Sequence, residues 1–311
     1  MNESPRTAHV LVNPAARKVR RFDPEAALRR LDAHGIDAIL EAPRSPEAFA
    51  RAARRAVDRA VDLLFVAGGD GTMRLAGGEL VGAATALAPL PLGTANILTT
   101  ESGLPGRWER AIDAHAGGQR VRMDVGLANG EIFLLMAGIG WDAAIASRVR
   151  RDLKHGLGAL AYILEAAKAI PGLRPRPLQM DIDGRDFGGD WGLIVLSNTR
   201  LYGGLVHFAP EASAVDGLLD VCAAGPRRPG QGTALATRLA TNRLREQPGL
   251  HLDRAAEVNI PTPGAPVQLD GDVVGETPMR FTVMPQALLL SVPSGPLPAL
   301  FRAGGGDTRW G

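Results

Sequence analysis

An apolar run that ends in a glycine-rich turn constrains this chain more than any other feature of its sequence. Asp62 to Ala67 reads as a strand with both faces apolar, which is typical of a parallel sheet covered by helices. The turn Gly68-Gly69-Asp70-Gly71-Thr72 follows at once, and its glycines let main-chain amides approach an anion closely. A helix predicted over Arg74 to Val81 would add its positive N-terminal end. We therefore predict a phosphate-binding turn here, with a simple glycine-rich connection as the alternative.

The first 120 residues alternate strand and helix signals. Asp23-Pro24 and Ser45-Pro46 each place a capping side chain before a proline, the pattern of a helix start. Such alternation indicates an α/β domain with a parallel sheet. The strands are predicted at 9–13, 36–40, 62–67 and 84–90, and the helices at 23–34, 45–58, 74–81, 94–102 and 108–115.

The pattern changes near residue 120 to short strands and turns. Asn129-Gly130 lies between two apolar runs, 121–128 and 131–137, which is a strong hairpin signal. A second hairpin is predicted around Gly184, between strands at 178–182 and 191–197. Further strands are predicted at 219–223, 257–260, 267–269, 279–283 and 288–292, and helices at 143–154, 157–169 and 232–246. We predict a mainly antiparallel β-sandwich over 121–293, after an α/β domain over 1–120 that also takes in 294–311.

Two more segments of the first half follow predicted strands. Pro91-Leu92-Gly93-Thr94-Ala95-Asn96 opens a helix, for which Thr94 is the predicted cap. Asn13-Pro14 follows the first strand, with a basic group behind it that could hold phosphates or be merely solvated: Arg17, Lys18, Arg20 and Arg21. Ligands of parallel sheets bind beyond the carboxyl ends of the strands. These segments and the glycine turn are therefore expected to share one crevice.

Two acidic motifs mark the second half. Leu269-Asp270-Gly271-Asp272 is compatible with a general base or metal pair, or with a plain hairpin turn. The stretch Pro210 to Asp220 has acids and turn carbonyls that could bind a hard cation.

Taken together and in order, these motifs resemble the diacylglycerol kinase catalytic family, which includes bacterial lipid kinases, sphingosine kinases and ceramide kinases. The resemblance rests on five motifs between about residues 8 and 293: Asn13-Pro14, Gly68 to Thr72, Pro91 to Asn96, Asp216 to Asp220 and Asp270 to Asp272. It implies a nucleotide-binding α/β domain like that of NAD kinases and phosphofructokinases, a C-terminal β-sandwich, and an active site in the cleft between them. The implied reaction is transfer of the γ-phosphoryl group of ATP to a lipid hydroxyl.

Carried over by position, the resemblance implies roles for individual residues. The ATP site would comprise Asn13, Pro14, Ala15, Ala16, Arg17, Gly68, Gly69, Asp70, Gly71, Thr72, Met73, Arg74, Thr94 and Asn96. Asp70 would act through Mg²⁺ at the phosphates. Asp216 would bind a structural Mg²⁺ with main-chain oxygens near Ser213 and Leu218. Asp272 would be the general base, although it is one methylene shorter than the glutamate usual there, and Asp70 is the rival base.

Two departures from the family pattern bear on nucleotide affinity. Arg74 stands where a small polar residue is usual, and no threonine ends the second strand near Ala42. The alternatives to a lipid kinase are an NAD kinase-like enzyme that phosphorylates a small molecule, and a regulatory protein that binds nucleotide or lipid with weak catalysis.

Composition limits the classes of binding partner that we expect. The net charge of +2 argues against a nucleic-acid binder, and the single cysteine, Cys222, cannot form a disulfide within the chain. With no signal-peptide core and no transmembrane span in the pattern, we expect a cytoplasmic protein that touches anionic membranes transiently and binds a lipid substrate; a homodimer is left open. A basic group could form the membrane contact or could instead be a solvated helix face: Arg148, Arg150, Arg151, Lys154, His155, Arg174 and Arg176.

Overall fold

The computed structural model describes residues 6–141, 143, 175–202, 206–207, 209–226, 230–240 and 248–302. Its contacts divide the chain into two compact units. The first unit comprises Met1–Met123 and Gln286–Arg302, and the second comprises Asp124–Pro285 and Ala303–Gly311. Each unit has a hydrophobic core of its own.

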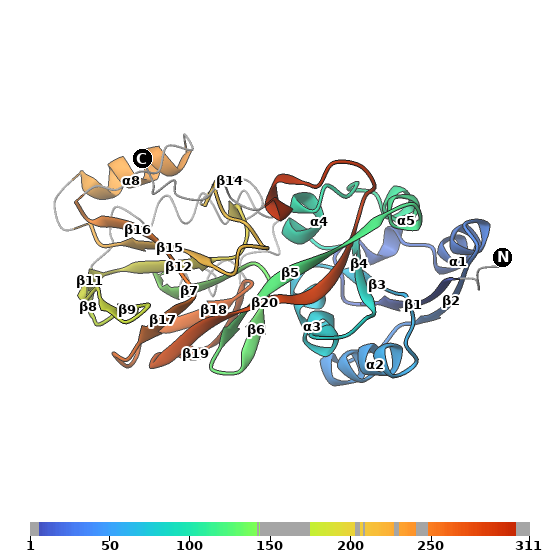
Figure 1. Cartoon of the computed structure of the whole chain (residues 1–311), viewed down its shortest axis with the longest axis horizontal. Helices are drawn as coiled ribbons and strands as arrows, with labels where there is room; N and C mark the ends of the chain where they lie inside the picture. The colour runs from blue at the N-terminus through green and yellow to red at the C-terminus, as the bar shows by residue number, and fades with distance from the viewer. Residues whose placement is uncertain are drawn as a thin grey trace. The chain divides into compact units, whose positions relative to one another are not determined.

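The first unit is built on a parallel sheet with the strand order β20-β4-β3-β1-β2 (Figure 1). The strands are β1 (Arg6–Val12), β2 (Ile36–Glu41), β3 (Leu63–Gly68), β4 (Ala86–Pro91) and the end of β20 (Met279–Val292). Every residue of β3 and β4 is buried. The sequence predicted these both-face apolar strands, because a sheet covered on two sides leaves no solvated face.

Helices cover both faces of this sheet (Figure 1). Residues of α1 and α5 share one core with alternate residues of the strands, whereas α2 contacts α3. The helices are α1 (Pro24–Ala33), α2 (Pro46–Asp58), α3 (Asp70–Leu80), α4 (Ile97–Glu101) and α5 (Trp108–Ala116). The predicted caps are present, since Asp23 Oδ1 accepts from Ala26 N–H at 3.0 Å and Ser45 Oγ accepts from Ala48 N–H at 3.2 Å.

A buried histidine of α5 ties the end of β20 to β4. His115 Nε2 lies 3.0 Å from Pro89 O, which can only accept, and Nδ1 lies 2.9 Å from Ser291 Oγ. Nε2 therefore carries a proton, and in the neutral ring Nδ1 accepts from the Ser291 hydroxyl. Burial lowers the pKa of His115 to about 4, and the bond to Pro89 offsets this only in part.

This histidine should make the first unit sensitive to acid. The unfolded chain takes up a proton near the ordinary pKa of 6.5, whereas the folded chain does so only near 4, so stability present above pH 6.5 is lost as the pH falls to about 4. The loss is about 3 kcal/mol. His115→Gln, which keeps a donor for Pro89, should therefore show a shallower fall in the free energy of unfolding between these pH values, measured by urea titration. An equally steep fall in the variant would contradict this account.

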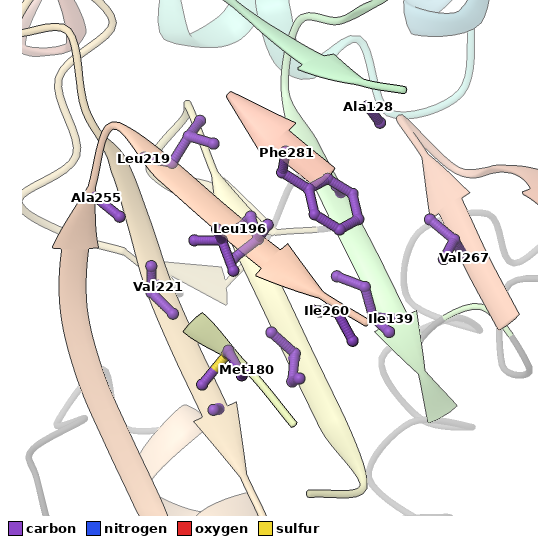
Figure 2. Packing of buried hydrophobic residues seen from close by; sticks show 14 of the residues in the cluster. Ala128, Ile139, Met180, Leu196, Leu219, Val221, Ala255, Ile260, Val267 and Phe281 are labelled. Carbon is purple, nitrogen blue, oxygen red and sulfur yellow. The ribbon is translucent and has the colours of Figure 1, made fainter. Parts of the chain in front are cut away.

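The second unit packs antiparallel strands around a shared apolar core (Figure 2). One sheet has the order β16-β15-β12-β7-β18-β19. Its strands are β7 (Met136–Gly140), β12 (Leu193–Ser197), β15 (Leu219–Ala224), β16 (Leu250–Ala255), β18 (Pro266–Leu269) and β19 (Asp272–Glu276). Facing residues come from β9 (Asp181–Ile182), β17 (Glu257–Ile260) and the start of β20, where Phe281 is fully buried near Ile139 and Ile260.

Local pairing in the second unit differs from the prediction at several points. The Asn129-Gly130 hairpin joins β5 (Gln119–Ala128) to β6 (Glu131–Phe133). The predicted strand 131–137 is interrupted at residues 134–135, and its last part belongs to β7 in the other sheet. The turn at Gly184 joins β9 to β10 (Arg185–Asp186), whereas β12 pairs with β7 and β15. The strands predicted at 279–283 and 288–292 are one strand, β20. Short apolar runs predict strands well, but they do not say which strand is the partner.

The remaining elements lie outside the two large sheets. They are β8 (Arg176–Leu178) with β11 (Gly189–Trp191), β13 (Leu201–Tyr202) with β14 (Val206–His207), α8 (Gln231–Ala240), and the 3-10 helices Val19–Arg21 and Ala299–Phe301. The helices predicted at 143–154 and 157–169, and the basic group from Arg148 to Arg174, lie outside the described residues apart from Ala143. No helix in the described part of the chain is long and apolar enough to cross a membrane.

Candidate active site

Three loops of the first unit meet at the carboxyl edge of its sheet. They follow β1, β3 and β4, which are neighbours and parallel. Main-chain hydrogen bonds lock them together: Asn13 N–H donates to Ala67 O, Leu92 N–H to Gly68 O and Lys18 N–H to Leu92 O. The structure thus brings together the three segments that the sequence analysis expected to share a crevice.

Glycines allow the two central loops to approach each other closely. A Cβ built on Gly69 would lie 3.1 Å from Gly93 Cα, and one built on Gly93 would collide with Gly69 Cα. Gly68 is equally constrained, because a Cβ there would lie 2.6 Å from Thr72 Cβ. A side chain at Gly93 or Gly68 would force its neighbours apart, whereas one at Gly69 would need only a small shift, so glycine is most strictly required at Gly93 and Gly68.

Asp70 connects these loops in a way that the sequence did not predict. It is the first residue of α3, so the helix starts four residues before the predicted Arg74 and takes in the last three residues of the predicted turn. Its Oδ1 accepts from Leu98 N–H at 3.2 Å, in the first turn of α4. Burial raises the pKa of Asp70, whereas the main-chain amides of Ile97 and Leu98 lower it. The carboxylate therefore supplies the helix α4 with its missing N-terminal acceptor.

The predicted cap at Thr94 is wrong. The N-cap residue of α4 is Asn96, in the left-handed region with φ 50°, and it makes no side-chain cap bond. Its Oδ1 instead accepts from Gly93 N–H at 2.8 Å and its Nδ2 donates to Gly93 O at 3.2 Å, which closes the Pro91–Asn96 loop on itself. Thr94 is exposed on this loop. Asn96 is thus a loop-shaping residue, and Thr94 is the side chain available to a ligand.

The loop after β1 is anchored by Asn13. Its Nδ2 donates to Thr72 Oγ1 at 2.9 Å and its Oδ1 accepts from Ala15 N–H at 2.9 Å. Pro14, Ala15 and Arg17 are exposed and Ala16 is half-buried. On α3, Met73 is buried in the core and Arg74 is half-buried. Among the residues predicted for an ATP site, Met73 is therefore a core side chain that a ligand would not meet.

A pocket of about 380 Å³ lies at the end of β2, on the same edge of the sheet. It is lined by Glu41, Ala42, Pro43, Ala48, Arg51 and Arg55. Arg55 is paired with Glu41 at 2.6 Å, and Glu41 Oε1 also lies 3.1 Å from Nε2 of the buried His9. Ala42, near the position where the family usually has threonine, thus lines this pocket.

In the second unit, the two acids of the Asp270-Gly271-Asp272 motif differ in their surroundings. The Asp270 carboxylate accepts from the main-chain amides of Leu134, Leu135 and Met136 at 2.8, 2.8 and 3.0 Å. Asp270 has φ 51°, and its own amide donates to Met136 O. Asp272 begins β19 and is half-buried. Asp270 is therefore an anchor of the turn, whereas none of these three amides donates to Asp272.

The predicted cation loop brings a further acid with it. Asp216 Oδ1 accepts from Leu218 N–H at 3.1 Å, and Ser213 Oγ lies 3.4 Å from Val215 N. Asp124, which the sequence analysis missed, is fully buried and its Oδ2 accepts from Gly217 N–H at 2.7 Å. Burial raises the pKa of Asp216, and the charge of Asp124 adds to the rise.

Asp220 closes this loop at its other end. Its Oδ1 lies 3.3 Å from Arg254 Nε, and Arg254 also donates to Glu211 O at 3.0 Å. Burial raises the pKa of Asp220 to about 7, although Arg254 opposes the rise. Within the described residues, no three side chains of the metal-binding types lie together as a metal cluster. A cation here would therefore need main-chain oxygens beside the carboxylates.

Comparison with known proteins agrees with this architecture. The profile described as the diacylglycerol kinase catalytic domain matches residues 7–128, and the one described as the YegS C-terminal NAD kinase beta sandwich-like domain matches residues 136–292. A diacylglycerol kinase of Bacillus subtilis (strain 168) is 31% identical over 69% of this chain and 72% of its own length. The chain belongs to the diacylglycerol kinase family of lipid kinases.

Further relatives and a solved structure extend the likeness over most of the chain. A Pseudomonas aeruginosa (strain UCBPP-PA14) protein named "Probable lipid kinase YegS-like" is 33% identical over 78% of this chain and 82% of its own length. A diacylglycerol kinase structure from Bacillus anthracis (strain Sterne) has a TM-score of 0.73 at 20% identity and covers 96% of this chain and 100% of that one. The predicted fold class, an α/β domain followed by a mainly antiparallel β-sandwich domain, is confirmed.

Proposed function

We propose that this protein transfers the γ-phosphoryl group of ATP to the hydroxyl of a lipid, either a diacylglycerol-like or a sphingoid lipid. Membership in the lipid kinase family supports the reaction type. The observation that carries the proposal is the joining of the Gly68–Thr72 and Pro91–Asn96 segments through Gly69, Gly93 and Asp70. A glycine-rich edge next to the N-terminus of α3 suits phosphate oxygens, because main-chain N–H groups at a helix N-terminus can donate to an anion.

The proposed nucleotide contacts follow from exposure. The exposed Thr94, Ala15 and Arg17 border the glycine segments, and Arg17 would supply a cation for the phosphates. Gly68, Asn13 and Thr72 would hold the shape of the edge, because Asn13 bonds Thr72 Oγ1 and Thr72 packs over Gly68.

Mg²⁺ is the cation that this chemistry requires, and the chain offers places that suit it. Asp70 would face the phosphates, and Asp216 would hold a second cation with main-chain oxygens near Ser213 and Leu218 and with Asp124 close by. The donor set is all oxygen, as hard cations prefer. Burial raises the pKa of Asp216 and the charge of the nearby Asp124 adds to the rise, so a cation beside the two carboxylates would relieve their repulsion. When bound, Mg²⁺ would neutralise phosphate charge in the transition state.

Asp272 is the proposed general base, which would accept the proton of the lipid hydroxyl. Asp270 is the less suitable base, because three main-chain amides donate to its carboxylate and stabilise its ionised form. A general base contributes about 10²–10⁴-fold to a rate.

The deciding experiment is a radiolabelled-ATP assay of the full chain against dispersed lipids. The panel should hold diacylglycerol, a sphingoid base and ceramide, with NAD as the competing acceptor and with Mg²⁺ varied. Labelled lipid that appears only with Mg²⁺ is expected. Labelling of NAD without any lipid would overturn the proposal in favour of a small-molecule kinase, and nucleotide binding without either product would favour a regulatory protein.

Substitution of each acid in the Asp270–Asp272 turn distinguishes a catalytic role from a structural one. Asp272→Asn should lower kcat by about 10²–10⁴-fold while the KM for ATP and the melting temperature stay near the parent values. Asp270→Asn should instead lower the melting temperature, since a neutral amide is a weaker acceptor for the amides of 134–136. The reverse pattern would assign the base to Asp270.

A lipid substrate also implies contact with a membrane surface. We propose a transient, peripheral contact with anionic lipid headgroups, from a protein of the cytoplasm that can form a homodimer. The exposed Arg176 on β8 is the one member of the basic group within the described residues. Binding to anionic liposomes should fall as salt rises, because headgroup attraction is screened.

A further inference from the structure

A buried amide side chain joins the two acidic sites of the second unit. Asn198 directly follows β12 and is fully buried. Its Nδ2 donates to Asp124 O at 2.9 Å and to Leu134 O at 3.0 Å, and its main-chain N–H donates to Leu135 O at 2.8 Å. It therefore holds β5 against the segment that links β6 to β7.

The chemistry of this position requires an amide. Both groups that face the Asn198 nitrogen are carbonyl oxygens, which only accept, so the nitrogen must lie toward them. The Asn198 Oδ1 is buried and has no hydrogen-bond partner within the described residues. A buried acceptor of this kind is one that a bound water molecule or ligand hydroxyl can complete.

One end of the network reaches the proposed cation loop. Asp124 N–H donates to Ala214 O at 2.7 Å, and Asp124 Oδ2 accepts from Gly217 N–H at 2.7 Å. Asp124 thus holds the loop on both sides of Asp216. Because Asn198 binds the carbonyl of the same residue, it fixes the strand position from which this carboxylate extends.

The other end reaches the turn that carries Asp272. Asn198 binds the carbonyls of Leu134 and Leu135, and the amides of these two residues and of Met136 bind the Asp270 carboxylate. The segment Leu134–Met136 is thus fixed from one side by Asn198 and from the other by Asp270. Asp272 follows two residues after this anchor.

We propose that Asn198 is a positioning residue that couples the cation loop at Asp216 to the turn of Asp272 through Asp124 and the segment Leu134–Met136. The inference rests on the proposed function for the roles of Asp216 and Asp272. It requires that a cation bound at the loop also stiffens Leu134–Met136, and reciprocally that loss of this link weakens cation binding.

Hydrogen exchange of the full chain tests the coupling, with Mg²⁺ alone and without nucleotide or lipid. Mg²⁺ should slow exchange of the amides at 213–218, and it should slow those of Leu134, Leu135 and Met136 by about 5-fold or more. Asn198→Asp keeps the shape but sets oxygen against two carbonyls. It should abolish the response at Leu134–Met136 and weaken Mg²⁺ binding by about 5-fold or more.

Ser197→Ala is the matched control, since Ser197 is an adjacent buried side chain whose hydroxyl donates to Thr199 O at 2.6 Å. Its response to Mg²⁺ should equal that of the parent. Protection at 213–218 without any change at Leu134–Met136 would overturn the coupling and leave the cation site standing. A lack of response at both segments would overturn the cation site as well. If Asn198→Asp does not fold, the parent chain alone decides between these outcomes.

Discussion

Gly93→Ala should nearly abolish kinase activity, because the added methyl group has no space at the centre of the proposed phosphate site. A Cβ at Gly93 would collide with Gly69 Cα and lie 2.7 Å from Asn96 Oδ1. Both are parts of loop backbone or of a loop-closing side chain, so neither can move without opening the edge. A shift of about 1 Å in groups that position a substrate costs about 10²-fold in rate. Overpacking also costs about 1–3 kcal/mol in stability.

Substitutions at two other glycines provide a milder variant and a control for this prediction. Gly69→Ala should be milder, because its Cβ would lie 3.1 Å from Gly93 Cα, a contact that a small shift can relieve. Gly106→Ala is the control, since nothing lies within 4 Å of a Cβ there. ATP affinity by calorimetry, kcat and the melting temperature would be measured for all three. Parent-like ATP binding by a folded Gly93→Ala variant would show that this edge does not hold the nucleotide.

Local signals in the sequence were sufficient to predict much of the first unit. The cap-proline pairs at Asp23 and Ser45 predicted the starts of α1 and α2, because a cap bond spans only three residues and depends on nothing distant. The apolar runs predicted β3 and β4, since a strand buried on both faces has no polar alternation.

The parts of the site that the sequence did not reveal depend on contacts between distant residues. Asp70 meets Leu98 N–H, Asp124 meets Gly217 N–H and Asp270 meets Leu134 N–H across 28, 93 and 136 residues. Motif spacing shows that an acid is present, but not which distant amides surround it. Motif spacing alone therefore could not tell the role of Asp270 from that of Asp272, and only the family resemblance named Asp272 as the base. The sequence also placed the cap of α4 on the nearest threonine, although the acceptor comes from α3.

The charge of Asp70 is expected to matter more for catalysis than for folding. Asp70→Asn keeps an oxygen that can accept from Leu98 N–H, so α4 should stay in place and the melting temperature should change little. The variant cannot attract a divalent cation to the phosphates, and removal of one such electrostatic group costs about 10²–10³-fold in kcat. Asp70→Ala removes the acceptor too, so it should lose both activity and stability.

The pH dependence of the parent enzyme provides an independent check on this carboxylate. Burial raises the pKa of Asp70, and the amides of Ile97 and Leu98 offset only part of that rise. Activity that needs the ionised form should therefore be lost, as the pH falls, at a higher pH than an exposed aspartate would dictate. This acid limb of the kcat profile should vanish in the residual activity of Asp70→Asn, because the amide does not titrate. A folded Asp70→Asn enzyme that phosphorylates lipid at the parent rate would remove Asp70 from the mechanism and leave it only as the cap of α4.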